Sequence, residues 1–582
     1  MNTDTITSVA PPNSEKSHAQ CLSQLDGLGS QWVVLLTCWF FTLAYHSGND
    51  GIWYQGDSPR HVMNSIFYMD LIAQGNNGLR QFSYEYYARY PAITPHRYPP
   101  FLYLVTATCF SLFGISCFIA KMVVQLFGLL LGSYTLLALR RWIAPQAGLV
   151  AGFVLLMPGC MTWSGAVMLN LPATALAVAC LYHLRCYLEE PDAEDAPNQF
   201  CIAVIYGTLS VATHPVVGVV FPISLAWLVM DRRWRWLLSR RVQVVLAVSI
   251  LVSVTLFGLL YSFSEQQFSQ TGVTTARLAK SFWPVYYFEA VPELISWPLL
   301  ITASLGIAHS LRDARYRRDG IRVLLASAVT LFMLSSIWAK DVRYMLWACP
   351  AATYFAAMAV VKIRDSRRFN CKPRFCASVS LICVASLFTY LGVVGWSSGL
   401  KSVNDFADVA DFVVDASPNE PVLYHGVYDG SFVCYLRLQD ERNRQQAILV
   451  RNLPLGLDKV WQVGASRMSR RGIRIKQPRS QLAPRKLLES LRETNCRLLI
   501  LEQMKRHEAD SICRAVEWLA DAGEVKALRR LHINMRSSQI VITVYEIAED
   551  AEIEPQPTIK PFPLKVGDKE YHPVLLSPSQ FH

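Results

Sequence analysis

The segment Gln55-Gly56-Asp57-Ser58-Pro59-Arg60-His61 follows the first hydrophobic run of the chain, Trp32–Tyr45. It places one acidic and two basic side chains next to a segment that is apolar enough to enter a membrane. Charged groups beside a membrane are costly unless they are exposed or paired, and they often mark functional sites. The segment therefore predicts a functional site at a membrane surface, and the apolar runs around it predict the fold.

The composition is that of a membrane protein. Of the 582 residues, 52% are hydrophobic and only 17% are charged, compared with about 25% charged residues in soluble proteins. The net charge of +11 comes largely from short basic loops between apolar runs, such as 231–241. This is the positive-inside pattern, and it argues against a nucleic-acid partner. The 15 cysteines are scattered without a CxxC motif, which gives no disulfide framework.

Apolar stretches alternate with polar loops up to about residue 398, and they predict about eleven membrane crossings. They lie near 31–47, 99–116, 118–140, 145–163, 165–188, 200–213, 215–230, 242–262, 291–311, 321–338, 345–363 and 375–397. Residues 1–30 are polar and are expected to form a disordered cytoplasmic tail. No small-residue cleavage site follows Trp32–Tyr45, so we expect a retained anchor.

Two topologies fit these stretches. In the favoured one, 99–116 is a re-entrant or interfacial helix, and 200–213 and 215–230 are two short spans. In the other, 99–116 crosses the membrane and 200–230 is one span kinked at Pro215. Both topologies place the loop 48–98, the loop 263–290, Lys340–Tyr344 and everything after 398 on the same outer face, where they can converge on one site.

The composition changes near residue 401, where helical and strand patterns alternate. We expect helices at 403–414, 484–494 and 511–522, and strands at 421–425, 447–450, 497–501 and 539–547, the last at a sheet edge. This alternation predicts a soluble, extracytoplasmic α/β domain over 401–549, in which parallel strands are an option. Residues 550–582 are proline-rich and are expected to be irregular.

Asp57 has two readings. A carboxylate in this loop can accept a proton from a substrate hydroxyl. Asp-Ser-Pro is also a common start of a helix, so Asp57 can cap the helix near 60–74. That helix carries Val62, Ile66, Met69 and Ile72 on roughly one face and is expected to lie on the membrane surface.

Other candidate ligand-binding groups lie on the same outer face. His96-Arg97-Tyr98 precede the apolar stretch 99–116 and can hold a phosphate, although interfacial anchoring explains them equally well. Lys340-Asp341-Val342-Arg343-Tyr344 runs against the positive-inside trend, so it is either a self-neutralised turn or a cationic clamp. His214 and Asn170 interrupt or begin apolar runs near this face. The substrate-binding candidates are Arg60, His61, His96, Arg97, Tyr98, Asn170, His214, Lys340, Arg343 and Tyr344. No metal-ligand spacing is present.

The order of these features resembles the membrane C-type (GT-C) glycosyltransferases that use polyprenyl-phosphate sugars, in particular family 39 and the RgtA/B/C/D-like members. The resemblance rests on Asp57, on Arg97-Tyr98-Pro99-Pro100 running to Phe113-Gly114, and on Lys340, Arg343 and Tyr344 before Pro350. It covers roughly 30–400, so residues 31–398 would form a GT-C-like transmembrane domain.

The resemblance implies an inverting transfer of a sugar from a polyprenyl-phosphate donor to a hydroxyl of a glycan, lipid or protein acceptor. Asp57 would be the base, and Arg97 and Arg343, with Lys340 as a further candidate, would stabilise the departing phosphate. The expected location is a bacterial inner membrane, with the C-terminal domain in the periplasm.

Some residues depart from this pattern. Asn170 stands where such enzymes often have a second acidic residue, and Ser58 where a glutamate is common. These differences leave dependence on a divalent cation open. They also keep two alternatives open: a transporter or flippase of a lipid-linked or anionic substrate, and an inactive membrane scaffold.

Overall fold

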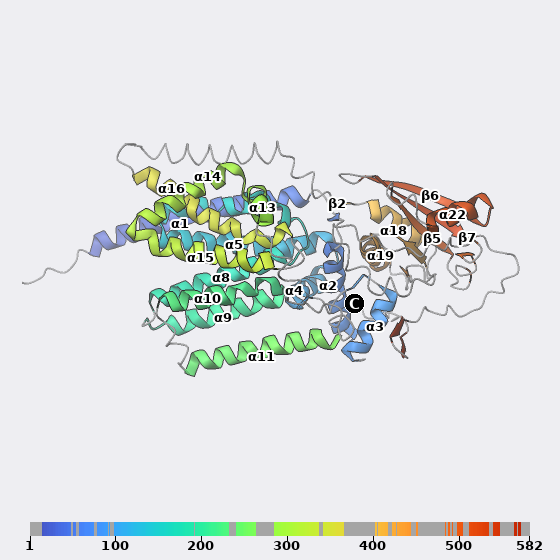
Figure 1. The fold of residues 1–582 in the computed structure, drawn as a ribbon, viewed down its shortest axis with the longest axis horizontal. Helices are drawn as coiled ribbons and strands as arrows, with labels where there is room; N and C mark the ends of the chain where they lie inside the picture. The colour runs from blue at the N-terminus through green and yellow to red at the C-terminus, as the bar shows by residue number, and fades with distance from the viewer. Residues whose placement is uncertain are drawn as a thin grey trace, which may run out of the picture.

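A computed structural model gives the fold. It describes residues 14–47, 51–53, 57–74, 78–90, 92–93, 98–190, 193–231, 240–263, 285–336, 341–365, 402–403, 405–416, 422–426, 428–443, 450–451, 484, 487–488, 492, 497–504, 511–534, 539–547, 564–566 and 569–571. A bundle of apolar helices forms one end of the molecule, and a β-sheet with its helices forms the other (Figure 1).

The apolar helices make the chain a multi-pass membrane protein. Five helical segments among the described residues are long and apolar enough to cross a membrane: Leu28–Ser47, Cys117–Trp142, Asn170–Glu189, Ala314–Ser336 and Val342–Ile363. Two bent pairs raise the number to seven if each counts as one span. They are Pro145–Leu156 with Pro158–Ser164, bent by 57°, and Val285–Ile295 with Trp297–Arg312, bent by 110°.

Several predicted spans form helices shorter than the roughly 20 residues that a perpendicular crossing needs. They include α4 (Phe101–Phe113) and Pro215–Met230. In contrast, α11 (Arg240–Phe263) has 24 residues and agrees with the span predicted at 242–262. Pro99 and Pro100 precede α4, and Gly114 ends it with a φ of 83°, a conformation that glycine adopts without strain. The stretch 375–397 lies outside the described residues.

Most of the remaining membrane helices agree with the apolar pattern. They are α1 (Ser14–Ser47), α5 (Cys117–Trp142), η1 (Pro145–Val150), α6 (Phe153–Leu156), α7 (Pro158–Ser164), α8 (Asn170–Glu189), α9 (Ala196–Thr213), η2 (Pro215–Val219), α10 (Val220–Met230), α13 (Val285–Ile295), α14 (Trp297–Arg312), α15 (Ala314–Ser336), η5 (Val342–Trp347) and α16 (Ala348–Asp365). The expected disorder of 1–30 is wrong in part, because α1 already begins at Ser14.

Three helices that follow the first membrane helix connect the two ends of the molecule. They are α2 (Asp57–Gln74), α3 (Leu79–Arg89) and α4, and α2 lies between the bundle and the sheet (Figure 1). The prediction of a membrane-surface helix with one apolar face is therefore wrong in detail. Val62 and Ile66 are fully buried, whereas Ile72, expected on the same face, is 66% exposed.

The C-terminal sheet has five strands in the order β4-β3-β5-β7-β6. β3 (Val422–His425) pairs in parallel with β4 (Val450–Arg451) and β5 (Leu498–Met504), and the antiparallel pair β7 (Gln539–Ile547) and β6 (Val525–Asn534) completes it. The predicted α/β character is confirmed. The edge position predicted for 539–547 is wrong, because β7 lies between β5 and β6.

Helices α18 (Asp405–Ala416), α19 (Asp429–Asn443) and α22 (Ser511–Asp521) accompany the sheet, and α19 was not predicted. Most of the helix expected over 484–494 lies outside the described residues. Within the stretch expected to be irregular, β8 (Leu564–Val566) pairs with β9 (Lys569–Tyr571) as an antiparallel hairpin.

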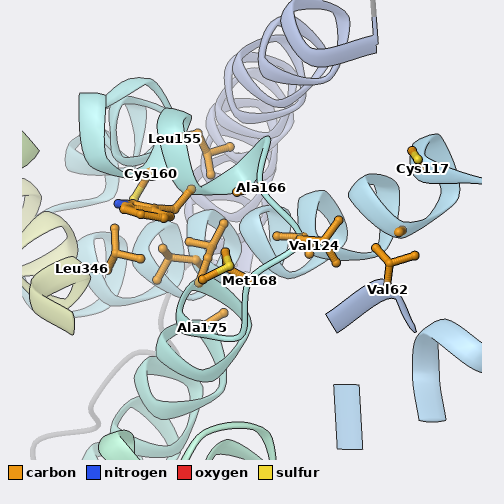
Figure 2. Close-up of a cluster of buried hydrophobic side chains, with 14 of the residues drawn as sticks. Val62, Cys117, Val124, Leu155, Cys160, Ala166, Met168, Ala175 and Leu346 are labelled. Atoms are coloured by element: carbon orange, nitrogen blue, oxygen red, sulfur yellow. The ribbon is translucent and has the colours of Figure 1, made fainter. Parts of the chain in front are cut away.

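One hydrophobic cluster runs through both ends of the molecule. In the bundle it joins Val62 of α2 to Val124 of α5, Leu155 of α6, Met168 and Leu346 of η5 (Figure 2). The same cluster continues through α2 into α18, α19 and the sheet. A short antiparallel pair, β1 (Ile52–Trp53) with β2 (Ser402–Val403), adds a backbone connection. The sheet is thus packed on the end of the bundle at which α2 lies.

Two ion pairs between α2 and α19 reinforce this packing. Arg437 donates to both oxygens of Asp70 at 3.3 Å, the Tyr86 hydroxyl donates to the same carboxylate at 2.7 Å, and all three side chains are buried. Nearer the start of both helices, Arg60 donates to Asp429 at 3.3 Å. Removing one partner of a buried pair leaves an uncompensated charge, which is strongly destabilising.

We predict that Asp70→Ala lowers the free energy of unfolding by about 3–5 kcal/mol, because Arg437 loses its buried partner. Arg141→Ala is the control. It breaks the ion pairs with Glu189 and Glu190, in which Arg141 is 38% exposed, and such exposed pairs contribute about 0–1 kcal/mol each. Thermal unfolding of both variants in detergent measures the difference. Equal effects of the two substitutions would contradict a structural role of the Asp70–Arg437 pair.

Candidate active site

The candidate site forms where α2 meets η5. Arg343 Nη2 donates to Asp57 Oδ2 at 2.9 Å, although the two residues are 286 positions apart in the chain. The Arg343 side chain is 11% exposed and that of Asp57 is 31% exposed, so the pair lies at the border between the protein interior and its surface. Asp57 is the first residue of α2, where the helix dipole favours a negative charge.

Arg343 is held in place from several sides. The Asp341 carboxylate accepts from the Arg343 backbone N–H at 3.2 Å, capping η5, and forms an ion pair with the Arg343 side chain at 3.2 Å. The guanidinium lies 5.8 Å from the ring centre of Trp163 and 5.7 Å from that of Tyr344. A cation placed against aromatic rings is stabilised by their quadrupoles. The guanidinium is therefore fixed before any ligand binds.

A row of aromatic and histidine rings continues from Arg343. The ring centres of Tyr344 and His214 are 5.8 Å apart, those of His214 and Tyr98 are 5.5 Å apart, and those of Tyr98 and His61 are 5.3 Å apart. His61 Nδ1 lies 2.8 Å from the hydroxyl of Tyr103 in α4. The row thus draws on α2, α4, the His214 break and η5, and it brings together residues that are far apart in sequence.

His214 lies in the break between α9 and η2. Its Nδ1 accepts from the Val216 backbone N–H at 3.1 Å, which places the proton of the neutral ring on Nε2. Burial lowers the pKa of His214 to about 3, Arg343 and His61 act in the same direction, and Asp57 opposes them. His214 is therefore neutral at physiological pH and offers one N–H donor.

The structure brings together six of the predicted site residues: Asp57, His61, Tyr98, His214, Arg343 and Tyr344. Arg60 instead pairs with Asp429. Asn170 is buried at the first residue of α8, and in the described part of the chain no side-chain hydrogen bond joins it to the other candidates. His96, Arg97 and Lys340 lie outside the described residues.

We searched the described residues for side chains that could bind a metal ion. No group of three or more His, Cys, Asp or Glu side chains is arranged there to hold an ion. Asp57 faces a guanidinium, and the amide of Asn170 is a weak metal ligand. The described residues therefore do not fit a divalent cation beside Asp57.

Sequence reasoning missed several residues that shape the site. Trp163 and Tyr103 contact Arg343 and His61, but nothing in their local sequence distinguishes them from other aromatic residues of apolar runs. Asp429 follows β3 and starts α19, so an acidic helix start was available as a signal. Burial raises the pKa of the Asp429 carboxyl, while Arg60 and the Gly430 backbone N–H oppose this shift.

The arrangement of the helices and the sheet defines the fold. It is the GT-C-like fold known from polytopic membrane glycosyltransferases, with a sheet packed on the Asp57 end of the bundle. The chain itself belongs to a family of unknown function (DUF6541), whose sequence profile matches residues 8–349. No curated protein matches the sequence.

Two solved structures illustrate the shared fold. ArnT from Cupriavidus metallidurans, bound to undecaprenyl phosphate, aligns with a TM-score of 0.57 over 89% of this chain and 97% of that chain, at 16% identity. The archaeal oligosaccharyltransferase AglB from Archaeoglobus fulgidus, in complex with an inhibitory peptide and a dolichol-phosphate, aligns with a TM-score of 0.53. That alignment covers 81% of this chain and 69% of AglB, at 11% identity.

The position of His214 predicts a specific pH dependence of stability. Because its folded pKa is lowered to about 3, the unfolded state binds the extra proton first as the pH falls below 6.5. The contribution of neutral His214 to the free energy of unfolding is therefore complete above pH 6.5 and is lost as the pH falls from 6.5 to 3. At pH 5 the loss is about 2 kcal/mol.

Thermal unfolding at pH 7 and pH 5 tests this prediction. The His214→Gln variant should lose less stability between these two pH values than the wild type. His532→Gln removes an exposed histidine of β6 and serves as the control for losing an imidazole. An unchanged pH dependence in His214→Gln would show that His214 is not buried as a neutral ring.

Proposed function

We propose that this protein is an inverting glycosyltransferase that moves a sugar from a polyprenyl-phosphate donor to an acceptor hydroxyl at the outer face of the membrane. The observation that carries the proposal is the Asp57–Arg343 contact at the outer end of the bundle. It joins a carboxylate suited to remove a proton with a guanidinium suited to bind a phosphate. The GT-C fold shared with ArnT and AglB supports the same reading.

In the proposed reaction, Asp57 takes the proton of the acceptor hydroxyl as its oxygen attacks the anomeric carbon. The bond between that carbon and the phosphate oxygen breaks, and the electron pair leaves with the polyprenyl phosphate. Arg343 stabilises the negative charge that develops on this phosphate. Such preorganised charge stabilisation is usually the largest single contribution to catalysis.

The ion pair suggests that the donor phosphate binds Arg343 before Asp57 acts on the acceptor. Before the donor binds, the guanidinium occupies one carboxylate oxygen of Asp57. A phosphate that binds Arg343 competes with this contact, because both anions use the same planar donor group. The Asp57 carboxylate then becomes available to the acceptor hydroxyl once the donor is in place.

The row of rings formed by Tyr344, His214, Tyr98 and His61 would line the sugar-binding part of the site. His214 offers its Nε2–H, and the hydroxyls of Tyr98 and Tyr344 are further polar groups. Aromatic faces and a few polar donors are typical of small-molecule sites. The C-terminal sheet, packed beside α2, would border the acceptor. We place this face in the periplasm of a bacterial inner membrane.

We predict that Asp57→Asn lowers sugar transfer by about 100-fold to 10,000-fold, the usual range for losing a general base. The amide is close in size to the carboxylate, so the fold should be preserved. The measurement adds radiolabelled polyprenyl-phosphate sugars to membranes and follows the label into acceptors or water. Asp313→Asn, between α14 and α15, is the control. Wild-type transfer by Asp57→Asn would favour a transporter or a scaffold.

The two partners of the ion pair should affect donor binding in opposite directions. Arg343→Ala removes the phosphate-binding cation, and we expect it to weaken binding of undecaprenyl phosphate at least about tenfold. Asp57→Asn removes the competing anion, and we expect it to strengthen the same binding. Ligand-dependent thermal stabilisation of the purified protein measures both effects without an acceptor. Equal weakening by both variants would contradict the proposed competition.

A further inference from the structure

A second cavity lies toward the end of the bundle opposite to Asp57. It has a volume of about 90 Å³ and lies among the second half of α5, the second half of α8, the first half of α15 and the start of α16. Arg185, at its floor, lies 15 residues beyond Asn170 on α8, which corresponds to about 22 Å along the helix. Arg343 does not line the cavity, although Trp347, four residues later in η5, does. The floor of the cavity is therefore separate from the candidate active site.

The cavity walls are mostly apolar, yet four of its lining residues carry a buried donor without a partner. Within the described part of the chain, no acceptor reaches Trp142 Nε1, Trp347 Nε1, Tyr354 Oη or Arg322 Nε. Trp227, which also lines the cavity, does donate to the Arg322 carbonyl at 3.3 Å. A buried polar group without a partner is costly, so several around one cavity indicate a ligand that supplies acceptors.

The charges at the floor of the cavity argue against an anionic ligand group. Arg185 pairs with Asp319 at 2.7 Å and with Glu189 at 2.9 Å. Arg322 pairs with Asp319 at 2.6 Å and also binds Asp231, which Arg318 contacts as well. Arg141 also pairs with Glu189 and with Glu190, so that four arginines and four carboxylates balance each other. The uncharged donors of the tryptophans and Tyr354 are left to bind a neutral acceptor.

We propose that this cavity binds a glycerolipid from the membrane leaflet opposite to the Asp57 site, through an ester carbonyl and the first methylene groups of the acyl chain next to it. A volume of about 90 Å³ leaves the rest of the chain outside the cavity. The carbonyl oxygen is a neutral acceptor and matches the unpartnered donors. The chain matches the apolar walls, which come from Leu139, Val178, Leu181, Val323 and Ala326. Tryptophan and tyrosine are enriched at the depth where lipid esters lie. This proposal is independent of the proposed glycosyl transfer.

Lipids with and without an ester carbonyl test the proposal. The full-length protein is purified in detergent, delipidated and titrated with diacyl phosphatidylcholine or with its di-ether analogue, and the bound lipid is counted by native mass spectrometry. We expect the ester lipid to bind at least about threefold more tightly, the effect of one net hydrogen bond. Equal binding of the two lipids would overturn the proposal, as would a preference set only by an anionic headgroup.

Variants locate the preference within the molecule. Trp142→Phe, Trp347→Phe and Tyr354→Phe each remove a donor and keep an aromatic ring. Each should reduce the preference for the ester lipid, and the triple variant should abolish it. Trp297→Phe, at a position of α14 that is 58% exposed, is the matched control and should keep it. A preference that survives in the folded single variants would overturn the assignment. Asp57→Asn should keep the full preference, which separates this test from the proposed transferase activity.

Discussion

The contact between Asp57 and Arg343 is the constraint on which the site depends. It joins the first residue of α2 to the start of the last described membrane helix, and it is possible only if both lie at the same end of the bundle. The pair is partly buried, so it is screened less by water and salt than a surface pair. Asp341, Trp163 and Tyr344 hold the guanidinium, and the start of α2 holds the carboxylate. The site is thus rigid before substrate enters.

The position of α2 in turn depends on the C-terminal region. Arg60 pairs with Asp429 near the start of both helices, and Asp70 pairs with Arg437 further along them, so the two pairs have opposite polarity. If α19 ran in the reverse direction, Arg60 would face Arg437 and Asp70 would face Asp429, which like-charge repulsion opposes. The charges therefore specify a parallel arrangement. Because Arg60 is less than one helical turn from Asp57, this arrangement also fixes the start of α2.

Local sequence patterns predicted those features of the structure that depend on neighbouring residues in the chain. The apolar runs, the helix start at Asp57 and the alternation after residue 401 all appear in the structure. The sidedness of the loops was enough to place Asp57 and Arg343 on one face. Contacts between residues far apart in sequence were not predictable in this way. The sequence of α2 predicts a surface helix, but in the structure α19 covers its second apolar face. The sequence of α19 shows little helical periodicity of its apolar residues, so this partner was not predicted. The edge position of 539–547 failed because β6 pairs with it from outside.

The charges around Arg343 suit reversible binding of a phosphate. In the described residues around the ring row, His214 is neutral, so it adds donor capacity without adding a cation. Arg343 is already shared between Asp57 and Asp341, which leaves this corner with two carboxylates for one guanidinium. An incoming phosphate must therefore displace at least part of these contacts, and their loss offsets part of its attraction to Arg343. Added cations would shift this balance, and Arg97 and Lys340 are the sequence candidates for that role. In the proposed reaction, an exchangeable contact with phosphate would suit a residue that binds the donor and then releases the product lipid.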